Sequence, residues 1–201
     1  MNAYLVAKPR WVMALVLSAA LMSLQVALIP SEVWEGLMRE QVLAGGGTPF
    51  PMPDRVTGWM SILTVVGAAL STSIAIPIGA GVLTGIFAFV LGDTGGYRQY
   101  LAVTAHSFFI PALVGLFSIP LKIATQDPQL TLNLGSFFFF LPSGYWISVL
   151  TAMDLTQIWS SLVIAQGAHC IDRRRSFTSA AVILLSLMLA MALIIGRLMP
   201  S

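Results

Sequence analysis

The chain has 201 residues, of which 57% are hydrophobic and only 9% are charged. Soluble globular domains carry about 25% charged residues, so this composition excludes a soluble enzyme domain, a nucleic-acid-binding domain and a disordered chain. The single cysteine, Cys170, excludes an internal disulfide and a cysteine-based metal cluster. We therefore expect an all-α integral membrane protein in which residues 1–201 form one membrane domain.

Uncharged runs of sequence predict the membrane spans, because about 20 residues of helix are needed to cross the hydrocarbon core. The second predicted span is too long for one straight crossing and too short for two, so we expect a tilted helix that bends near Pro77. The fourth is at the short limit for a span. The sequence thus predicts five transmembrane helices in a compact bundle, at about 11–30, 59–91, 99–121, 155–171 and 177–197.

Two further segments are expected to be short interfacial helices rather than spans. In residues 32–42, apolar side chains recur at helical spacing among charged ones, which is typical of a helix lying on the membrane surface. Residues 137–153 look apolar, but Pro142 and Gly144 interrupt them. There we expect a phenylalanine-rich wedge in the interface, followed by a short helix that ends near Met153.

The distribution of basic residues predicts the orientation of the chain. Five spans place six basic residues in the cytoplasm and four outside, whereas a sixth span at 128–153 would reverse this count. We therefore expect a cytoplasmic N-terminus and an external Ser201. The alternative for the first span is a signal peptide, but its apolar stretch is longer than such peptides have. The cytoplasmic residues in the favoured topology are Lys8, Arg10, Arg98, Arg173, Arg174 and Arg175.

Asp154 lies between two apolar stretches and begins the sequence D-L-T-Q. Our favoured interpretation is a helix N-cap, with the Gln157 side chain reaching back to complete a capping box. The alternative is a proton or ion site, since acidic residues within membranes are usually functional.

His106 is the polar residue in the middle of the third predicted span. It has no acidic residue at helical spacing, so we expect a packed or cavity-facing imidazole satisfied by Thr104 and Ser107, with a proton relay as the alternative. One histidine, one cysteine and one aspartate near residue 170 are too few for a zinc site. No metal ion or cofactor is expected.

The basic cluster Arg173, Arg174 and Arg175 is interpreted as a topology determinant, because a lipid-binding cluster usually has four to eight basic residues. In the fourth span, Trp159, Val163 and Gly167 are four residues apart and form one stripe. We expect a neighbouring helix to approach this stripe most closely at Gly167, with the nearby Ala165 facing lipid. The alternative is that Trp159 merely faces lipid and that Gly167 is incidental.

Two stretches of this sequence resemble the Yip family, multi-pass proteins named for interacting with Ypt and Rab small GTPases. The first is LAVTAHSFFIPALVGL, with Pro111 at the turn of the third span, and the second is LTAMDLTQIWSSLVIAQG, with the D…W…G signature of Asp154, Trp159 and Gly167. His106 and Thr156 depart from the family pattern, in which both positions are usually aromatic. Only about ten residues precede the first predicted span, so GTPase binding is not carried over.

The resemblance implies a five-span fold in the bacterial inner membrane without a known catalytic centre. No nucleophile signature occurs in the sequence, such as GxSxG or HExxH, and no span holds paired acids. We therefore expect a non-enzymatic accessory, scaffold or adaptor protein that assembles with other membrane proteins or with itself. The alternative function is a small transporter or permease subunit.

Overall fold

The computed structural model describes residues 9–46, 54–138, 140–142 and 144–198, and within these ranges the chain forms helices and no strand. Lys8 and Ser201, which entered the predicted orientation, lie outside the described residues. In chain order the elements are α2 (Val12–Leu28), α3 (Ser31–Ala44), α4 (Asp54–Thr84), the π-helix η1 (Gly85–Val90), α5 (Tyr97–Ser107), α6 (Phe109–Phe117), α7 (Ile119–Thr125), the 3-10 helix η2 (Leu134–Phe137), α8 (Tyr145–Ala152), α9 (Leu155–Ile171) and α10 (Phe177–Leu198).

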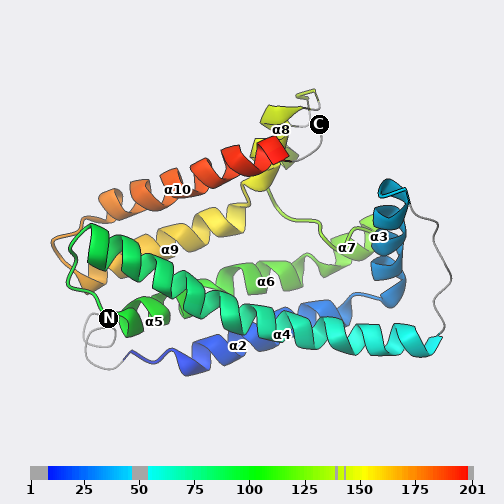
Figure 1. Cartoon of the computed structure of the whole chain (residues 1–201), viewed down its shortest axis with the longest axis horizontal. Helices are drawn as coiled ribbons and strands as arrows, with labels where there is room; N and C mark the ends of the chain where they lie inside the picture. The colour runs from blue at the N-terminus through cyan, green and yellow to red at the C-terminus, as the bar shows by residue number, and fades with distance from the viewer. Residues whose placement is uncertain (1–8, 47–53, 139, 143, 199–201) are drawn as a thin grey trace.

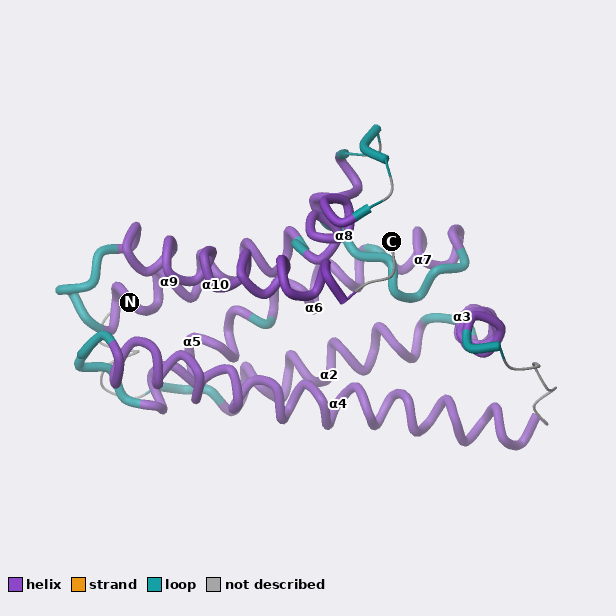
Figure 2. The backbone as a smooth tube through the Cα atoms, turned by 45° about the horizontal axis from the view of Figure 1, so that its top comes forward, coloured by secondary structure: helices purple, strands orange, loops and turns teal. Residues whose placement is uncertain are grey.

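The helices α2, α4, α5–α6, α9 and α10 run along the long axis of the molecule and alternate in direction (Figure 1). One end of this bundle holds the loop 91–96 and the hinge 172–176, and we call it the hinge end. The opposite end holds α3 and α7, and we call it the α3 end. Figure 2 shows α3 end-on while α2 and α4 run across the view, because α3 is bent by 83° from α2.

Three helical segments are long and apolar enough to span a membrane: Ser61–Val90, Tyr97–Phe117 and Phe177–Leu198. The bent pair of α2 and α3 makes a fourth if it is one broken span. The predicted spans at 11–30 and 155–171 correspond to α2 and α9, which have 17 residues each. At 1.5 Å per residue such a helix is about 25 Å long, shorter than the hydrocarbon core. Length and composition thus give three or four spans within the described residues and do not confirm the predicted five.

The second and third predicted spans differ from expectation in their internal breaks. The helix α4 continues through Pro77, and the change in helix type comes later, where η1 begins at Gly85. The predicted span 99–121 is not one helix, because it breaks at Phe108 and again at Ser118. Each break precedes a helix with a proline in its first turn, where the missing N–H costs least.

Both predicted interfacial segments contain a helix. Residues 32–42 lie in α3, which has 14 residues, and the segment 137–153 contains the eight-residue helix α8. The chain also places Asn133 beside Asp154 in an isolated antiparallel bridge, so the segment before α8 is tied to the start of α9. The chain is therefore anchored on both sides of α8.

The centre of the bundle is built from small side chains packed around α5. Small residues let helix backbones approach closely, which is how helices associate where lipid removes the hydrophobic driving force. Seven of the eleven residues of α5 are buried, although it is less apolar than its neighbours. The fully buried alanines are Ala80, Ala102, Ala105, Ala112, Ala165, Ala168 and Ala180.

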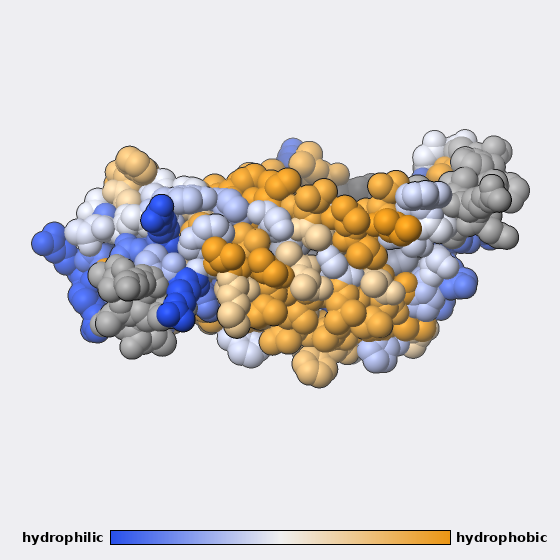
Figure 3. Space-filling view, turned by 90° about the horizontal axis from the view of Figure 1, so that it is seen from below, coloured by the Kyte–Doolittle hydropathy of each residue, from blue (hydrophilic) through white to orange (hydrophobic). Residues whose placement is uncertain are grey.

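The surface divides into an apolar middle and polar ends. Figure 3 shows a broad hydrophobic face between two more hydrophilic ends of the long axis. Large apolar side chains are also exposed along α4 and α10, including Leu63, Ile74, Ile78, Val182 and Ile194. Exposed apolar area of this extent is typical of a surface that faces lipid.

Candidate functional site

Polar side chains within the bundle are used to join helices. The Ser18 hydroxyl of α2 donates to the carbonyl of Ala105 at 3.3 Å, and the buried Gln25 amide donates to the carbonyl of Ala112 at 2.7 Å. The Gln25 amide occupies the space that a side chain at Gly115 would fill. Each bond places a side-chain donor of one helix on a backbone carbonyl of another, so these groups stabilise packing.

Pro111 has a specific structural consequence that joins α5–α6 to α9. A proline has no N–H, so the carbonyl four residues earlier, on Ser107, loses its helical partner. The buried Ser160 hydroxyl of α9 donates to this carbonyl at 3.1 Å. The break that Pro111 imposes therefore creates an acceptor that α9 uses.

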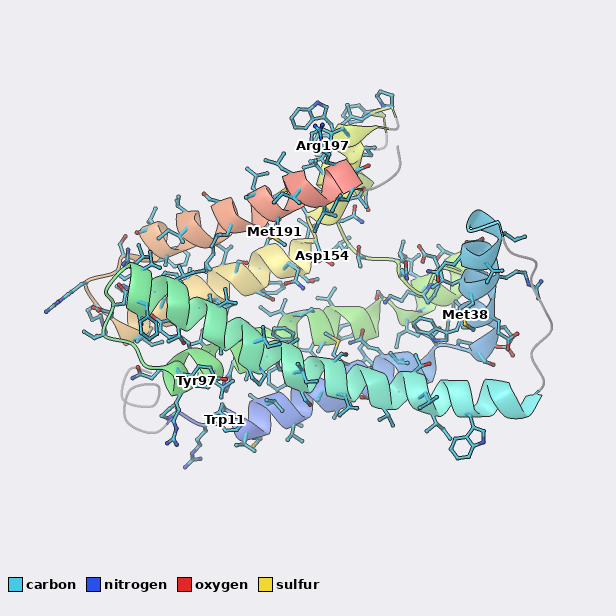
Figure 4. The ribbon with its side chains drawn as sticks, viewed as in Figure 1. Trp11, Met38, Tyr97, Asp154, Met191 and Arg197 are labelled. Atoms are coloured by element: carbon cyan, nitrogen blue, oxygen red, sulfur yellow. The ribbon has the colours of Figure 1, made fainter. Side chains whose placement is uncertain are left out.

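Asp154 is the N-cap of α9 and lies where the chain enters that helix (Figure 4). Its Oδ1 accepts bonds from both the N–H and the hydroxyl of Thr156, each at 2.6 Å. The side chain of Gln157 is exposed and takes no part in this cap. The capping box is thus wrong in its second member, because the buried Thr156 hydroxyl supplies the additional bond.

The stripe on α9 is packed at one end only. Gly167 is buried, and a Cβ there would collide with the Val103 side chain of α5, so the close approach at Gly167 is as expected. Trp159 is 58% exposed and Val163 lies at the surface. Ala165, which we expected to face lipid, is wholly buried, because α9 packs between α5 and α10 and so buries two faces.

His106 lies on the surface of α5 rather than in the core. Its Nδ1 is 2.7 Å from the carbonyl of Ala102, and a carbonyl can only accept, so Nδ1 carries the proton. The Thr104 and Ser107 hydroxyls donate to carbonyls of their own helix instead of to the imidazole. His106 is therefore exposed, with a tilted ring contact to Phe109 at 6.5 Å between ring centres, and in this tautomer its Nε2 is an acceptor.

The hinge end holds a cluster of charged and polar groups that the sequence did not reveal. We call Asp93, Thr94, Asp172 and Arg175 the hinge clamp. The Arg175 guanidinium donates to both carboxylate oxygens of Asp93, with a shortest distance of 2.6 Å, and also to the carbonyl of Leu91. It lies 5.9 Å from the ring centre of Phe87, within range of a cation–π contact.

The second half of the hinge clamp is centred on Asp172, which is buried. Its Oδ2 accepts from the N–H and the hydroxyl of Thr94, and its Oδ1 accepts from the N–H of Arg174. The backbone N–H groups of Thr94 and Arg174 stabilise the carboxylate, and they hold the pKa of Asp172 below its ordinary value. The clamp ties the loop before α5 to the hinge after α9.

Arg175 is thus held by Asp93, whereas Arg173 and Arg174 are exposed. The bond to Asp93 raises the pKa of Arg175, so it is charged at every accessible pH. The three arginines that the sequence grouped as topology determinants therefore differ in structure. The sequence did contain a signal for this pair. Asp93 follows the second predicted span and Arg175 precedes the fifth, so the predicted topology places both residues on the same side of the membrane.

A cavity of about 470 Å³ lies at the α3 end, between the end of α2, α3, the start of α4 and Gln129. Its apolar walls include Val26, Ile29 and Leu37, and Glu35 is its one charged lining residue. Trp34 also lines the cavity. Its indole N–H is enclosed and has no hydrogen-bond partner among the described residues. A cavity with a few polar groups among apolar walls is suited to binding a small group.

No three His, Cys, Asp or Glu side chains are grouped as metal ligands in the part of the chain that the structure describes. No family model, curated protein or solved structure matches this chain.

Proposed function

We propose that this chain is a non-enzymatic multi-pass membrane protein that acts as an accessory, scaffold or adaptor protein for other membrane proteins. The Yip resemblance implies this class of protein and a five-span topology. We further propose that the hinge end faces the cytoplasm of a bacterial cell. Four arginines are exposed there, which the positive-inside rule favours: Arg10, Arg98, Arg173 and Arg174.

The exposed His106 is the observation that carries this proposal. It is the tenth of 21 residues in the segment Tyr97–Phe117, and so lies near mid-membrane if that segment spans. Facing lipid, the Nε2 acceptor would have no donor, and such unpaired polar groups are costly in hydrocarbon. A hydroxyl or amide N–H on a neighbouring membrane helix would satisfy it.

Transport is a less favoured function because the polar groups that motivated it have structural partners. The Thr104 hydroxyl donates to the carbonyl of Tyr100, and the Ser107 hydroxyl donates to that of Thr104. The Ser107 carbonyl accepts from Ser160. Uptake of a substrate by the purified protein alone in liposomes would favour transport over the proposal.

Photo-crosslinking in intact cells tests the proposed assembly. A benzophenone side chain placed at residue 106 should form one adduct of defined mass, and its mass identifies either a second copy or another membrane protein. The control position is Leu187, which is exposed near the middle of α10 and so lies at a comparable depth. Equal adducts at both positions, or none at residue 106, would contradict a specific partner on this face.

The substitution His106→Leu provides the matching functional measurement. Because the side chain is exposed, the variant should fold with an unchanged yield, yet it should lose the partner that co-purifies after gentle solubilisation. The variant His106→Gln should retain part of this association, since its amide oxygen is still an acceptor. Retention of the partner by His106→Leu at wild-type levels would contradict the proposal.

A further inference from the structure

We infer that the cavity at the α3 end binds a phosphoethanolamine group, supplied by the headgroup of phosphatidylethanolamine in the surrounding bilayer. This inference is independent of the proposed scaffold function. It concerns the α3 end of the bundle, whereas the hinge clamp lies at the opposite end and His106 lies between the two. It is carried by the position of the cavity, by one orphaned donor and by the sign of its one charge.

The position of the cavity matches that of lipid headgroups. Its floor is formed by Ser61, Thr64 and Val65, which lie in the second and third turns of α4, shortly after the charged residues Asp54 and Arg55 in the sequence of that helix. Its wall includes Val26 and Ala27, from the last turn of α2. The cavity is therefore at the level where the apolar spans end, which is where headgroups meet the hydrocarbon core.

The helix α3 forms the outer wall. Because of its 83° bend from α2, it lies across the end of the bundle, and Met38, labelled in Figure 4, lies on it. A helix in this direction lies along the membrane surface if the bundle stands upright. The polar groups of α3 are thereby placed beside the ends of the spans, next to the headgroups.

Two donor features of the cavity call for an acceptor such as a phosphate. The enclosed indole N–H of Trp34 has no partner among the described residues. Ser31 and Trp34 also belong to the first turn of α3, a 14-residue helix without a side-chain N-cap bond. Helix N-termini carry unpaired N–H groups and a partial positive charge, and they bind phosphate.

The charge of the cavity selects a zwitterionic ligand over an anionic one. Glu35 is a lining residue, and no lysine or arginine lines the cavity. A purely anionic headgroup would meet the Glu35 carboxylate without compensation, whereas a primary ammonium group would donate to it. Phosphoethanolamine combines the acceptor that Trp34 requires with the ammonium group that Glu35 requires.

The apolar side of the cavity gives a place for the start of the acyl chains. Val26, Ile29, Leu37 and Val65 line it. A free phosphoethanolamine molecule would leave these side chains uncovered, so the lipid-linked form is the expected source. The lipid-linked and the free form can be distinguished by asking whether soluble phosphoethanolamine competes for the site.

Native mass spectrometry of the detergent-solubilised protein tests this inference. The protein is mixed with equal amounts of dioleoyl phosphatidylethanolamine and dioleoyl phosphatidylglycerol, and the bound lipid is measured. We expect the wild-type protein to retain phosphatidylethanolamine at about tenfold higher occupancy, the factor that corresponds to one charge-assisted hydrogen bond. Soluble phosphoethanolamine should not displace it, and displacement at matched concentration would assign the site to a soluble ligand of the same chemistry.

Two substitutions with matched controls locate the binding. Glu35→Gln should abolish the preference over phosphatidylglycerol, and Trp34→Phe, which removes the indole N–H but keeps a smaller aromatic ring, should lower occupancy. Glu40→Gln and Trp59→Phe change exposed residues that do not line the cavity, and both should behave as wild type. Equal retention of both lipids by the wild-type protein, an unchanged preference in folded Glu35→Gln, or an unchanged occupancy in folded Trp34→Phe would overturn the inference.

Discussion

At the scale of single residues, charge is used at the hinge end to fix one arrangement of loops. Asp93 and Arg175 are 82 residues apart in sequence, and their side chains are 5% and 16% exposed. A buried ion pair contributes little net free energy, but removing one member leaves the other charge uncompensated. The hinge clamp therefore makes specific predictions for Arg175 and for Asp172.

Removal of Arg175 should destabilise the protein far more than removal of its neighbour. Arg175→Gln leaves the Asp93 carboxylate without its partner, and we expect the free energy of unfolding to fall by about 3 kcal/mol. Arg174→Gln removes an equal charge from an exposed side chain and should change it by less than about 0.5 kcal/mol. Thermal unfolding in detergent measures both, and equal effects would show that Arg175 acts only through net charge.

Asp172 should make stability depend on acid pH. Its pKa is lowered in the folded protein, chiefly by the N–H groups of Thr94 and Arg174, so its contribution is fully present above the unfolded pKa of about 3.9. That contribution is lost as the pH falls through the lower folded pKa. Wild-type unfolding temperature should therefore drop in this range relative to that of Asp172→Asn, and parallel pH profiles of the two proteins would contradict it.

At the scale of elements, the helix contacts depend on small residues and on backbone acceptors. The helix α9 meets α5 at Gly167 and meets the broken backbone before Pro111 through Ser160. Both contacts join α9 to α5–α6, and substitutions can test each contact separately.

The bond from Ser160 should depend on Pro111. Ser160→Ala leaves the Ser107 carbonyl without a donor, and we expect a loss of about 1 kcal/mol in the free energy of unfolding. In the Pro111→Ala background a new N–H at residue 111 can donate to that carbonyl, so the same substitution should cost less. A double-mutant cycle measures the difference, and additive losses would contradict the coupling.

The close approach at Gly167 should depend on the size of Val103. Gly167→Ala places a methyl group against the Val103 side chain, and overpacking of this kind costs about 1–3 kcal/mol. Val103→Ala should restore part of this loss. Gln166→Ala, which changes an exposed residue on the same helix, is the control. Thermal aggregation in detergent measures Gly167→Ala with and without Val103→Ala, and Gln166→Ala, and an equal effect of Gln166→Ala would remove the role of Gly167.

The sequence predicted the positions of helices better than their packing. The apolar runs and the residues that interrupt them predicted the positions of α3, α8, α9 and α10, because these positions follow from local composition. The burial of Ala165 was not predictable, since polar and apolar residues are spread around α9 and give no period that separates lipid from protein. The hinge clamp was missed because its partners are far apart in sequence, although both lie at the same end of the predicted bundle.

At the scale of the whole molecule, the number of crossings determines which ends share a compartment. The helices α2, α4, α5–α6, α9 and α10 alternate in direction along the long axis (Figure 1), but among the described residues only three segments, or four with the bent pair, are long and apolar enough to span alone. The short helices α2 and α9 lie beside longer neighbours, and the bilayer can thin around short spans. We therefore propose that all five cross.

Topology mapping with alkaline phosphatase fusions tests this central claim most directly, because the enzyme is active only outside the cytoplasm. We predict low activity for fusions after Gly96 and Arg175, which lie at the hinge end, and high activity after Ser136 and Leu198. Matching activities after Arg175 and Leu198, or opposite activities after Gly96 and Arg175, would contradict the five-span account.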